Sequence, residues 1–232
     1  MTELRRTRSR ALTGIDHPTR RPLVAVLIAV LGAILVVTLG FVMKAGQADQ
    51  GLSVALNKLH TGAWGAFSNA VYQAIEPVPA VVITAVIAAV VWAVSRSLRT
   101  ALLFGLTVAL TWLPVAAVKI IVDRPRPDPA LLSHPFSPVQ VDGSVPSGHT
   151  AYIVALAFAF WFLLRDTRYS WAPVVFGVIG TAVVGLAVVS DGLHFPTDAL
   201  GSVVWALTTA AAVRWIVVDL IAARIAPRRT RR

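Results

Sequence analysis

The chain has 232 residues, of which 56% are hydrophobic and only 14% are charged. Ordinary soluble domains carry about 25% charged residues, so this composition argues against a soluble protein and indicates a membrane protein. There is no cysteine, which excludes disulfides and thiolate metal sites, and the net charge of +10 comes from cations clustered at the ends of apolar runs, so we expect no nucleic-acid binding.

Six apolar runs follow one another along the chain, each close to the length of a membrane-crossing helix. They cover residues 23–43, 78–94, 101–122, 149–164, 172–190 and 199–221. About 20 helical residues cross a hydrocarbon core, and continuous rather than alternating runs favour helices over barrel strands. We therefore predict an all-α polytopic membrane protein. A bundle of six transmembrane helices would occupy residues 23–222, with basic cytoplasmic tails at 1–22 and 223–232.

Basic residues suggest the orientation of this bundle. The first run follows an arginine-rich leader, as in a signal peptide, but its roughly 21 residues exceed the 7 to 15 apolar residues of a signal sequence, which favours an uncleaved helix. If the helices alternate, the links at 95–99 and 165–168 and both tails lie on one side. By the positive-inside rule that side is cytoplasmic, with both termini inside the cell. We expect the tails to contact anionic lipid headgroups.

Residues 51–75, after the first run, show a weaker helical pattern. Their large apolar residues recur near helical spacing, with polar residues between them. The pattern predicts one or two helices lying in the membrane interface, with Trp64 and Tyr72 at headgroup depth. The alternative is a short helix that packs over the bundle.

Three cations mark the outer end of the third run. Lys119 taken alone is typical of a lysine that extends to the interface. Arg124 and Arg126 alternate with Pro125 and Pro127, which bias the segment toward a stiff, extended conformation. Arginine offers forked donors to phosphate oxygens and lysine a point charge, so the segment favours a phosphate site.

A helix start with anion-binding potential precedes the fourth run. Ser147 taken alone is best interpreted as an N-cap. The backbone N–H groups of Gly148 and His149 would then be unpaired at the positive end of the helix dipole, which binds anions readily. His149 is also placed to donate a proton.

Polar residues also separate the fifth and sixth runs. Pro196 predicts the first turn of a helix, and Asp198 is then able to reach back to His194. A carboxylate on one imidazole nitrogen leaves the other free as a nucleophile or base. The alternative is an interfacial histidine beside a helix-start aspartate.

Together these three segments resemble the type 2 phosphatidic acid phosphatase family, membrane relatives of vanadium haloperoxidases and bacterial acid phosphatases. Residues 119–127, KIIVDRPRP, match the family motif K-x6-R-P; residues 146–149 match P-S-G-H; and residues 194–198, HFPTD, match the H-x3-D end of the third motif. The resemblance covers residues 75–222 and includes the order and spacing of the motifs.

The resemblance implies a phosphohistidine mechanism. His194 would attack phosphorus, Asp198 would orient it, and His149 would protonate the leaving oxygen. No metal or cofactor is implied, and the acidic residues form no plausible Mg²⁺ cluster. The residues implied to hold the phosphoryl oxygens are Lys119, Arg126, Ser147 and Gly148.

The third motif departs from the family pattern S-R-x5-H-x3-D. Ala187 and Val188 stand where the family has serine and arginine. Losing one such donor typically costs about 100-fold in rate. Arg124 could replace it, the substrate could bring compensating contacts, or the protein could bind lipid phosphates with little turnover. The intact His194 favours activity.

The expected substrate is a lipid phosphate taken from the bilayer at the outer face. The resemblance admits polyprenyl and glycerolipid phosphates, and phosphotransfer as well as hydrolysis, and we favour cell-envelope lipid carriers. The runner-up is a non-catalytic lipid-phosphate binding or transport protein. His17, His60 and His134 are expected to be bystanders on tails or loops.

Overall fold

The computed structural model describes residues 14–225, and every regular element in that range is helical. The longer helices are α2 (Pro22–Gly46), α3 (Gln50–Asn57), α4 (Gly62–Ala74), α5 (Pro77–Ser95), α6 (Leu98–Trp112), α7 (Val115–Val122), α8 (Gly148–Leu164), α9 (Ala172–Ser190) and α10 (Pro196–Trp215). The remaining elements are η1 (Gly14–Asp16), η2 (Pro129–Leu131), the π-helical η3 (Ile216–Ile221) and α11 (Ala222–Ile225). The predicted basic tails lie largely outside the described residues.

Five helical stretches among the described residues are long and apolar enough to cross a membrane: Pro22–Gly46, Pro77–Ser95, Leu98–Val122, Ala172–Ser190 and Pro196–Arg224. Every predicted apolar run falls on a helix, which confirms the all-α membrane fold. The third run is divided near Pro114, where α6 gives way to α7. The helix of the fourth run, α8, has only 17 residues, so the number of six spanning helices stays a prediction.

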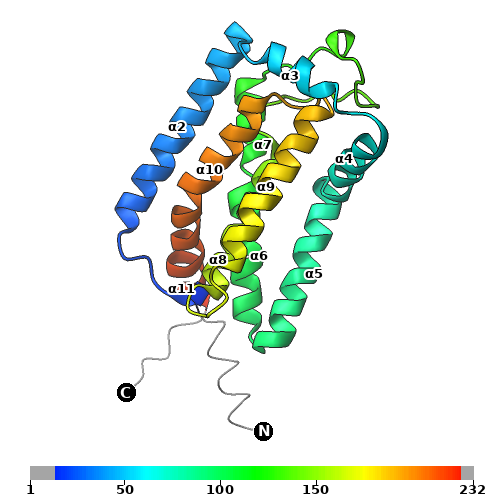
Figure 1. The fold of residues 1–232 in the computed structure, drawn as a ribbon. Coiled ribbons are helices and arrows are strands. Elements are labelled where there is room, and N and C mark those ends of the chain that lie inside the picture. Colours follow the sequence, from blue (N-terminus) through cyan, green and yellow to red (C-terminus); the bar gives the residue numbers. More distant parts are fainter. Residues whose placement is uncertain (1–13, 226–232) are drawn as a thin grey trace, which may run out of the picture.

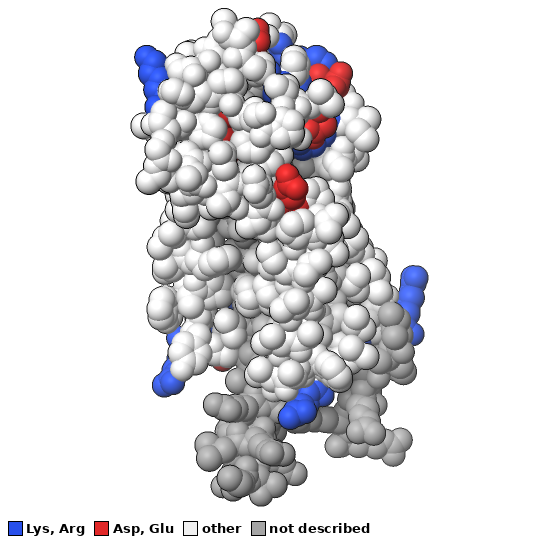
Figure 2. Space-filling model, turned by 90° about the vertical axis from the view of Figure 1, so that its right-hand side faces the viewer, with Lys and Arg blue, Asp and Glu red and all other residues white. Residues whose placement is uncertain are grey.

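The bundle is built around the shorter helix α8. Eleven of its 17 residues are buried, and it packs against α6, α9 and α10. Helices at the periphery of the bundle instead expose large apolar side chains, as α2 does with Leu23, Leu27 and Leu31. Charged side chains on the face shown in Figure 2 gather toward the two ends and leave the middle uncharged. This arrangement suits a helix bundle surrounded by lipid.

All three motif segments lie at the end of the bundle where α3 and α4 are found (Figure 1). Both short helices pack against α9. Trp64 donates from its indole N–H to Ser190 Oγ at 3.0 Å, and the ring of Tyr72 is buried against His149 and Phe136. The segment predicted as interfacial therefore forms two helices that cover the bundle. The predicted headgroup depth of Trp64 and Tyr72 remains a prediction.

His60 is not the bystander that its place in a loop predicts. Its Nδ1 lies 2.6 Å from the carbonyl oxygen of His134, and its Nε2 lies 2.9 Å from Asn69 Oδ1 and 3.6 Å from the buried carboxylate of Asp191. Burial raises the pKa of Asp191 to about 6, against the opposing effects of Ser68 and His60. These contacts fasten the α3–α4 link to the segment that carries the third motif.

Candidate functional site

His194 is fixed in a tight connection between α9 and α10. Gly192 adopts a positive φ of 76°, and the amides of Leu193 and His194 both donate to the Val188 carbonyl oxygen at 3.1 Å. Asp198, in the first turn of α10, accepts at Oδ2 from the Phe195 amide at 2.8 Å. The same Oδ2 lies 3.6 Å from His194 Nδ1, which is ion-pair distance but too long for a hydrogen bond. The two side chains therefore lie next to each other without a hydrogen bond between them.

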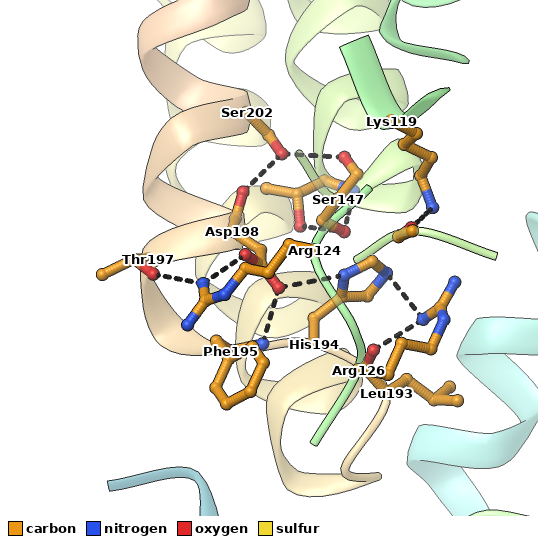
Figure 3. A network of polar contacts seen from close by, with 12 residues as sticks. Lys119, Arg124, Arg126, Ser147, Leu193, His194, Phe195, Thr197, Asp198 and Ser202 are labelled. Atoms are coloured by element: carbon orange, nitrogen blue, oxygen red, sulfur yellow. Dashed lines mark hydrogen bonds and ion pairs between the residues drawn. The ribbon is translucent and has the colours of Figure 1, made fainter. Parts of the chain in front are cut away.

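The other nitrogen of the imidazole faces Arg126. NH1 of Arg126 lies 3.4 Å from His194 Nε2 and donates to the Leu193 carbonyl oxygen at 2.6 Å (Figure 3). Burial of the ring, followed by the charges of Arg126 and Lys119, lowers the pKa of His194 well below its usual range. The imidazole is therefore neutral at neutral pH, the form that carries a nucleophilic lone pair.

Lys119 and Arg126 converge on one carboxylate, that of Asp142. Lys119 Nζ lies 2.8 Å from Asp142 Oδ2, and Arg126 NH2 lies 2.7 Å from Oδ1. Burial alone would raise the pKa of Asp142, but the bonds to the two cations outweigh it and hold the pKa below its usual range. The structure thus brings together two of the predicted phosphate ligands around an anion. Sequence reasoning missed Asp142, which stands in a loop outside the motifs.

Ser147 and its neighbours form the start of α8. Ser147 Oγ accepts from the Thr150 amide at 3.3 Å, and its own amide donates to the Asp198 carbonyl oxygen at 3.2 Å. Ser147 is fully buried, so its hydroxyl caps the helix rather than lining the cavity. Gly148 and His149 do line the cavity, and the His149 ring stacks on Tyr72 with centroids 4.3 Å apart.

The cavity has a volume of about 500 Å³ and a lining that mixes polar and apolar residues. Its polar lining residues are Tyr72, Glu76, Lys119, Arg126, Gln140, Asp142, Gly148 and His149, and its apolar lining residues are Ile75, Pro77, Trp112, Leu113, Val115 and Ala116. Charged and apolar lining residues together suit a ligand with a charged headgroup and an apolar chain. His194 lies behind Arg126, with 1% of its surface exposed, so a phosphorus atom reaches it only when Arg126 shifts.

Arg124 does not face this cavity. Its guanidinium is 1% exposed and forms ion pairs with Asp49 and with Asp198, on the side of His194 opposite Arg126 (Figure 3). Swinging into the cavity would break both pairs and leave two buried carboxylates uncompensated, at a cost of about 3–5 kcal/mol for each broken pair. The geometry thus contradicts the suggestion that Arg124 replaces the missing arginine. Asp123, which could have paired with it, instead lies 3.9 Å from Lys44.

Val188 is fully buried in the last turn of α9, six residues before His194. Its carbonyl oxygen accepts from the amide of His194, which places position 188 beside the histidine. The side chain brings no charge there. Within residues 14–225, the cations that line the cavity are Lys119 and Arg126.

Comparisons with known proteins agree with this geometry. Residues 100–222 match the family model described as PAP2 superfamily. Undecaprenyl-diphosphatase BcrC of Bacillus subtilis (strain 168) is 33% identical over 90 residues, which span 39% of this chain and only 44% of that relative. The crystal structure of a transmembrane PAP2 type phosphatidylglycerolphosphate phosphatase from Bacillus subtilis matches with a TM-score of 0.61 over 90% of this chain and 99% of that one, at 19% identity.

The family match covers more than half of the chain and contains all the residues of the three motifs. The structural match extends the likeness to the fold of nearly the whole chain. The membrane-spanning helix bundle, the three motif segments at one end of it and the family match lead to one conclusion: the chain belongs to the PAP2 superfamily.

Proposed function

We propose that the protein is a membrane phosphatase that hydrolyses the phosphomonoester or diphosphate of a lipid at the outer face of the membrane. One observation carries the proposal: a neutral, buried His194 lies between the carboxylate of Asp198 and the guanidinium of Arg126, and Arg126 lines a cavity with both charged and apolar residues. A pure binding protein has no physical need for an oriented nucleophile.

In the proposed reaction the phosphoryl group replaces the Asp142 carboxylate between Lys119 and Arg126. The Nε2 lone pair of His194 attacks phosphorus, and the bond from phosphorus to the leaving oxygen breaks. A proton reaches that oxygen through His149. Water, deprotonated by His149, then cleaves the phosphorus–nitrogen bond. The two cations and the Gly148 amide stabilise the charge that builds on the phosphoryl oxygens.

We infer an amphiphilic substrate, because the cavity has both charged and apolar lining residues. The similarity to an undecaprenyl-diphosphatase favours polyprenyl diphosphates. The fold is shared with a phosphatase for a glycerolipid phosphate, which keeps that class as the second candidate.

A substrate panel tests the proposal. Purified protein in detergent would be offered undecaprenyl diphosphate, phosphatidylglycerophosphate and phosphatidic acid, with His194→Ala as the matched inactive variant. We expect wild type to release phosphate and His194→Ala to lose at least ~10³-fold in rate, as for other nucleophiles. Equal rates from both proteins would refute the mechanism.

The buried Val188 favours one alternative, a protein that binds lipid phosphates with little turnover. That protein would bind labelled lipid phosphate but give no phosphohistidine in rapid-quench experiments. A labelled intermediate that disappears in His194→Ala would exclude this alternative.

A further inference from the structure

Asp49 lies in the link between α2 and α3, outside all three motifs. It occupies the N-cap position of α3, yet its side chain makes no capping bond to that helix. Its carboxylate instead accepts from Arg124 NH2 at one oxygen, and at the other from the Thr197 amide at 3.2 Å and the Thr197 hydroxyl. The side chain is 8% exposed. Burying a carboxylate costs free energy, and capping of its own helix, α3, does not explain why Asp49 is buried at the start of α10.

The reason lies in how Arg124 is shared. Its NH2 binds Asp49, while its NH1 donates to Asp198 Oδ1 at 2.7 Å and to the Thr197 hydroxyl at 2.9 Å. The guanidinium also lies over the Phe195 ring, 3.7 Å from its centroid. The arginine fork is therefore divided between two carboxylates, one nitrogen to each.

Because Arg124 contacts only one oxygen of Asp198, the second oxygen can face the histidine. Oδ2 accepts from the Phe195 amide and faces His194 Nδ1, while Oδ1 is held by Arg124. Arginine prefers to bind a carboxylate with both nitrogens. Without the charge of Asp49, Arg124 would engage both oxygens of Asp198 and draw the carboxylate away from the imidazole.

We propose that Asp49 is a positioning residue for the reaction, which acts through Arg124 on Asp198 and thereby on His194. The inference rests on the proposed function of His194 as nucleophile. It also links the covering helix α3, which begins directly after Asp49, to the reacting group. Asp49 does not line the cavity, so its effect belongs to the chemical step rather than to substrate binding.

Asp49→Asn tests this role because it removes the charge and keeps the shape. In metal sites, replacing a residue that orients a ligand histidine typically costs about 10–100-fold in activity. By analogy, we expect Asp49→Asn to lower the single-turnover rate of phosphohistidine formation by a factor of that order. KM should not change. Asp123→Asn is the matched control, since Asp123 directly precedes Arg124 but has a side chain 80% exposed. It should react at the wild-type rate.

A mutant cycle shows whether Asp49 acts through Arg124. Adding Asp49→Asn to Arg124→Gln should lower the rate little further, because Arg124→Gln already lacks the guanidinium through which Asp49 acts on Asp198. Independent, multiplying effects would overturn the proposal, as would a wild-type rate in Asp49→Asn or a change confined to KM. Asp49→Glu keeps the charge, should retain more of the rate than Asp49→Asn with KM unchanged, and carries the test if Asp49→Asn does not fold.

Failure of the two proposals would look different. If wild type forms no phosphohistidine at His194, the proposed function fails, and the role of Asp49 with it. If wild type forms the intermediate at His194, and Asp49→Asn forms it equally fast, only the positioning role fails.

Discussion

At the scale of single residues, the site is a set of charges that hold one another in place. His194, Asp198, Lys119 and Arg126 were recognisable because the chain spaces them in a known pattern. Asp142 was not, because it meets the two cations only after the loop folds back over α7. The place of Arg124 was not predictable for a similar reason: spacing cannot tell that two arginines, two residues apart, lie on opposite sides of one imidazole.

In the proposed reaction the substrate phosphate binds to Lys119 and Arg126, so Asp142, which pairs with both cations, should compete with the substrate. We expect Asp142→Asn to lower KM about fivefold, the equivalent of ~1 kcal/mol for partly exposed ion pairs. Because the pKa of Asp142 is held below its usual range, the carboxylate stays charged above that range. The ratio of the two KM values should then be constant from about pH 5 upward.

Initial rates over a range of substrate concentrations and pH values measure this ratio. Asp128→Asn, an exposed aspartate in the same loop, is the control for a general change in surface charge. A higher KM in Asp142→Asn would show that this carboxylate aligns the cations rather than competing for them.

At the scale of helices, the hydrophobic runs predicted where the long helices lie but not where those helices are interrupted. The run at 101–122 does not reveal the break at Pro114, because its residues are apolar on both sides. The π-helix at 216–221 is equally invisible in composition. Small residues decide how closely helices approach, and their importance appears only when the partner is known. Gly32 on α2 is such a case, since α2 packs most extensively on α10.

Gly32→Ala should loosen that packing. A Cβ at position 32 would lie 2.4 Å from the Cβ and 2.0 Å from the Oγ1 of Thr208 on α10, so the helices must separate. Overpacking of this kind costs about 1–3 kcal/mol and should lower the Tm in detergent. Gly105→Ala on α6 meets nothing within 4 Å and should leave the Tm equal or slightly higher. Similar Tm changes in both variants would argue against close packing of α2 on α10.

At the scale of the whole molecule, the charge distribution predicted two different ends, and the structure gathers the three motif segments at one of them. Which end faces the outside is set by the membrane rather than by contacts within the chain. The sequence argument for orientation rests on cations in the tails and the links at 95–99 and 165–168. That argument remains a prediction.

The absence of native cysteine makes this orientation directly measurable. Ser133→Cys places an exposed thiol at the motif end, and Ser170→Cys a partly exposed one at the opposite end. In intact cells a membrane-impermeant maleimide should label position 133, and position 170 only after permeabilisation. The reverse pattern would place the candidate site inside the cell.

The contact between α2 and α10 also constrains the order of assembly during synthesis. Among the long helices, α2 is synthesised first and α10 last. α2 therefore has no α10 to pack against until the rest of the chain has been made. Asp49, in the link after α2, contacts Thr197 only when α10 is present. A nascent chain that has inserted only its earlier helices therefore lacks part of the candidate site, and the proposed reaction has to wait until α10 has been made.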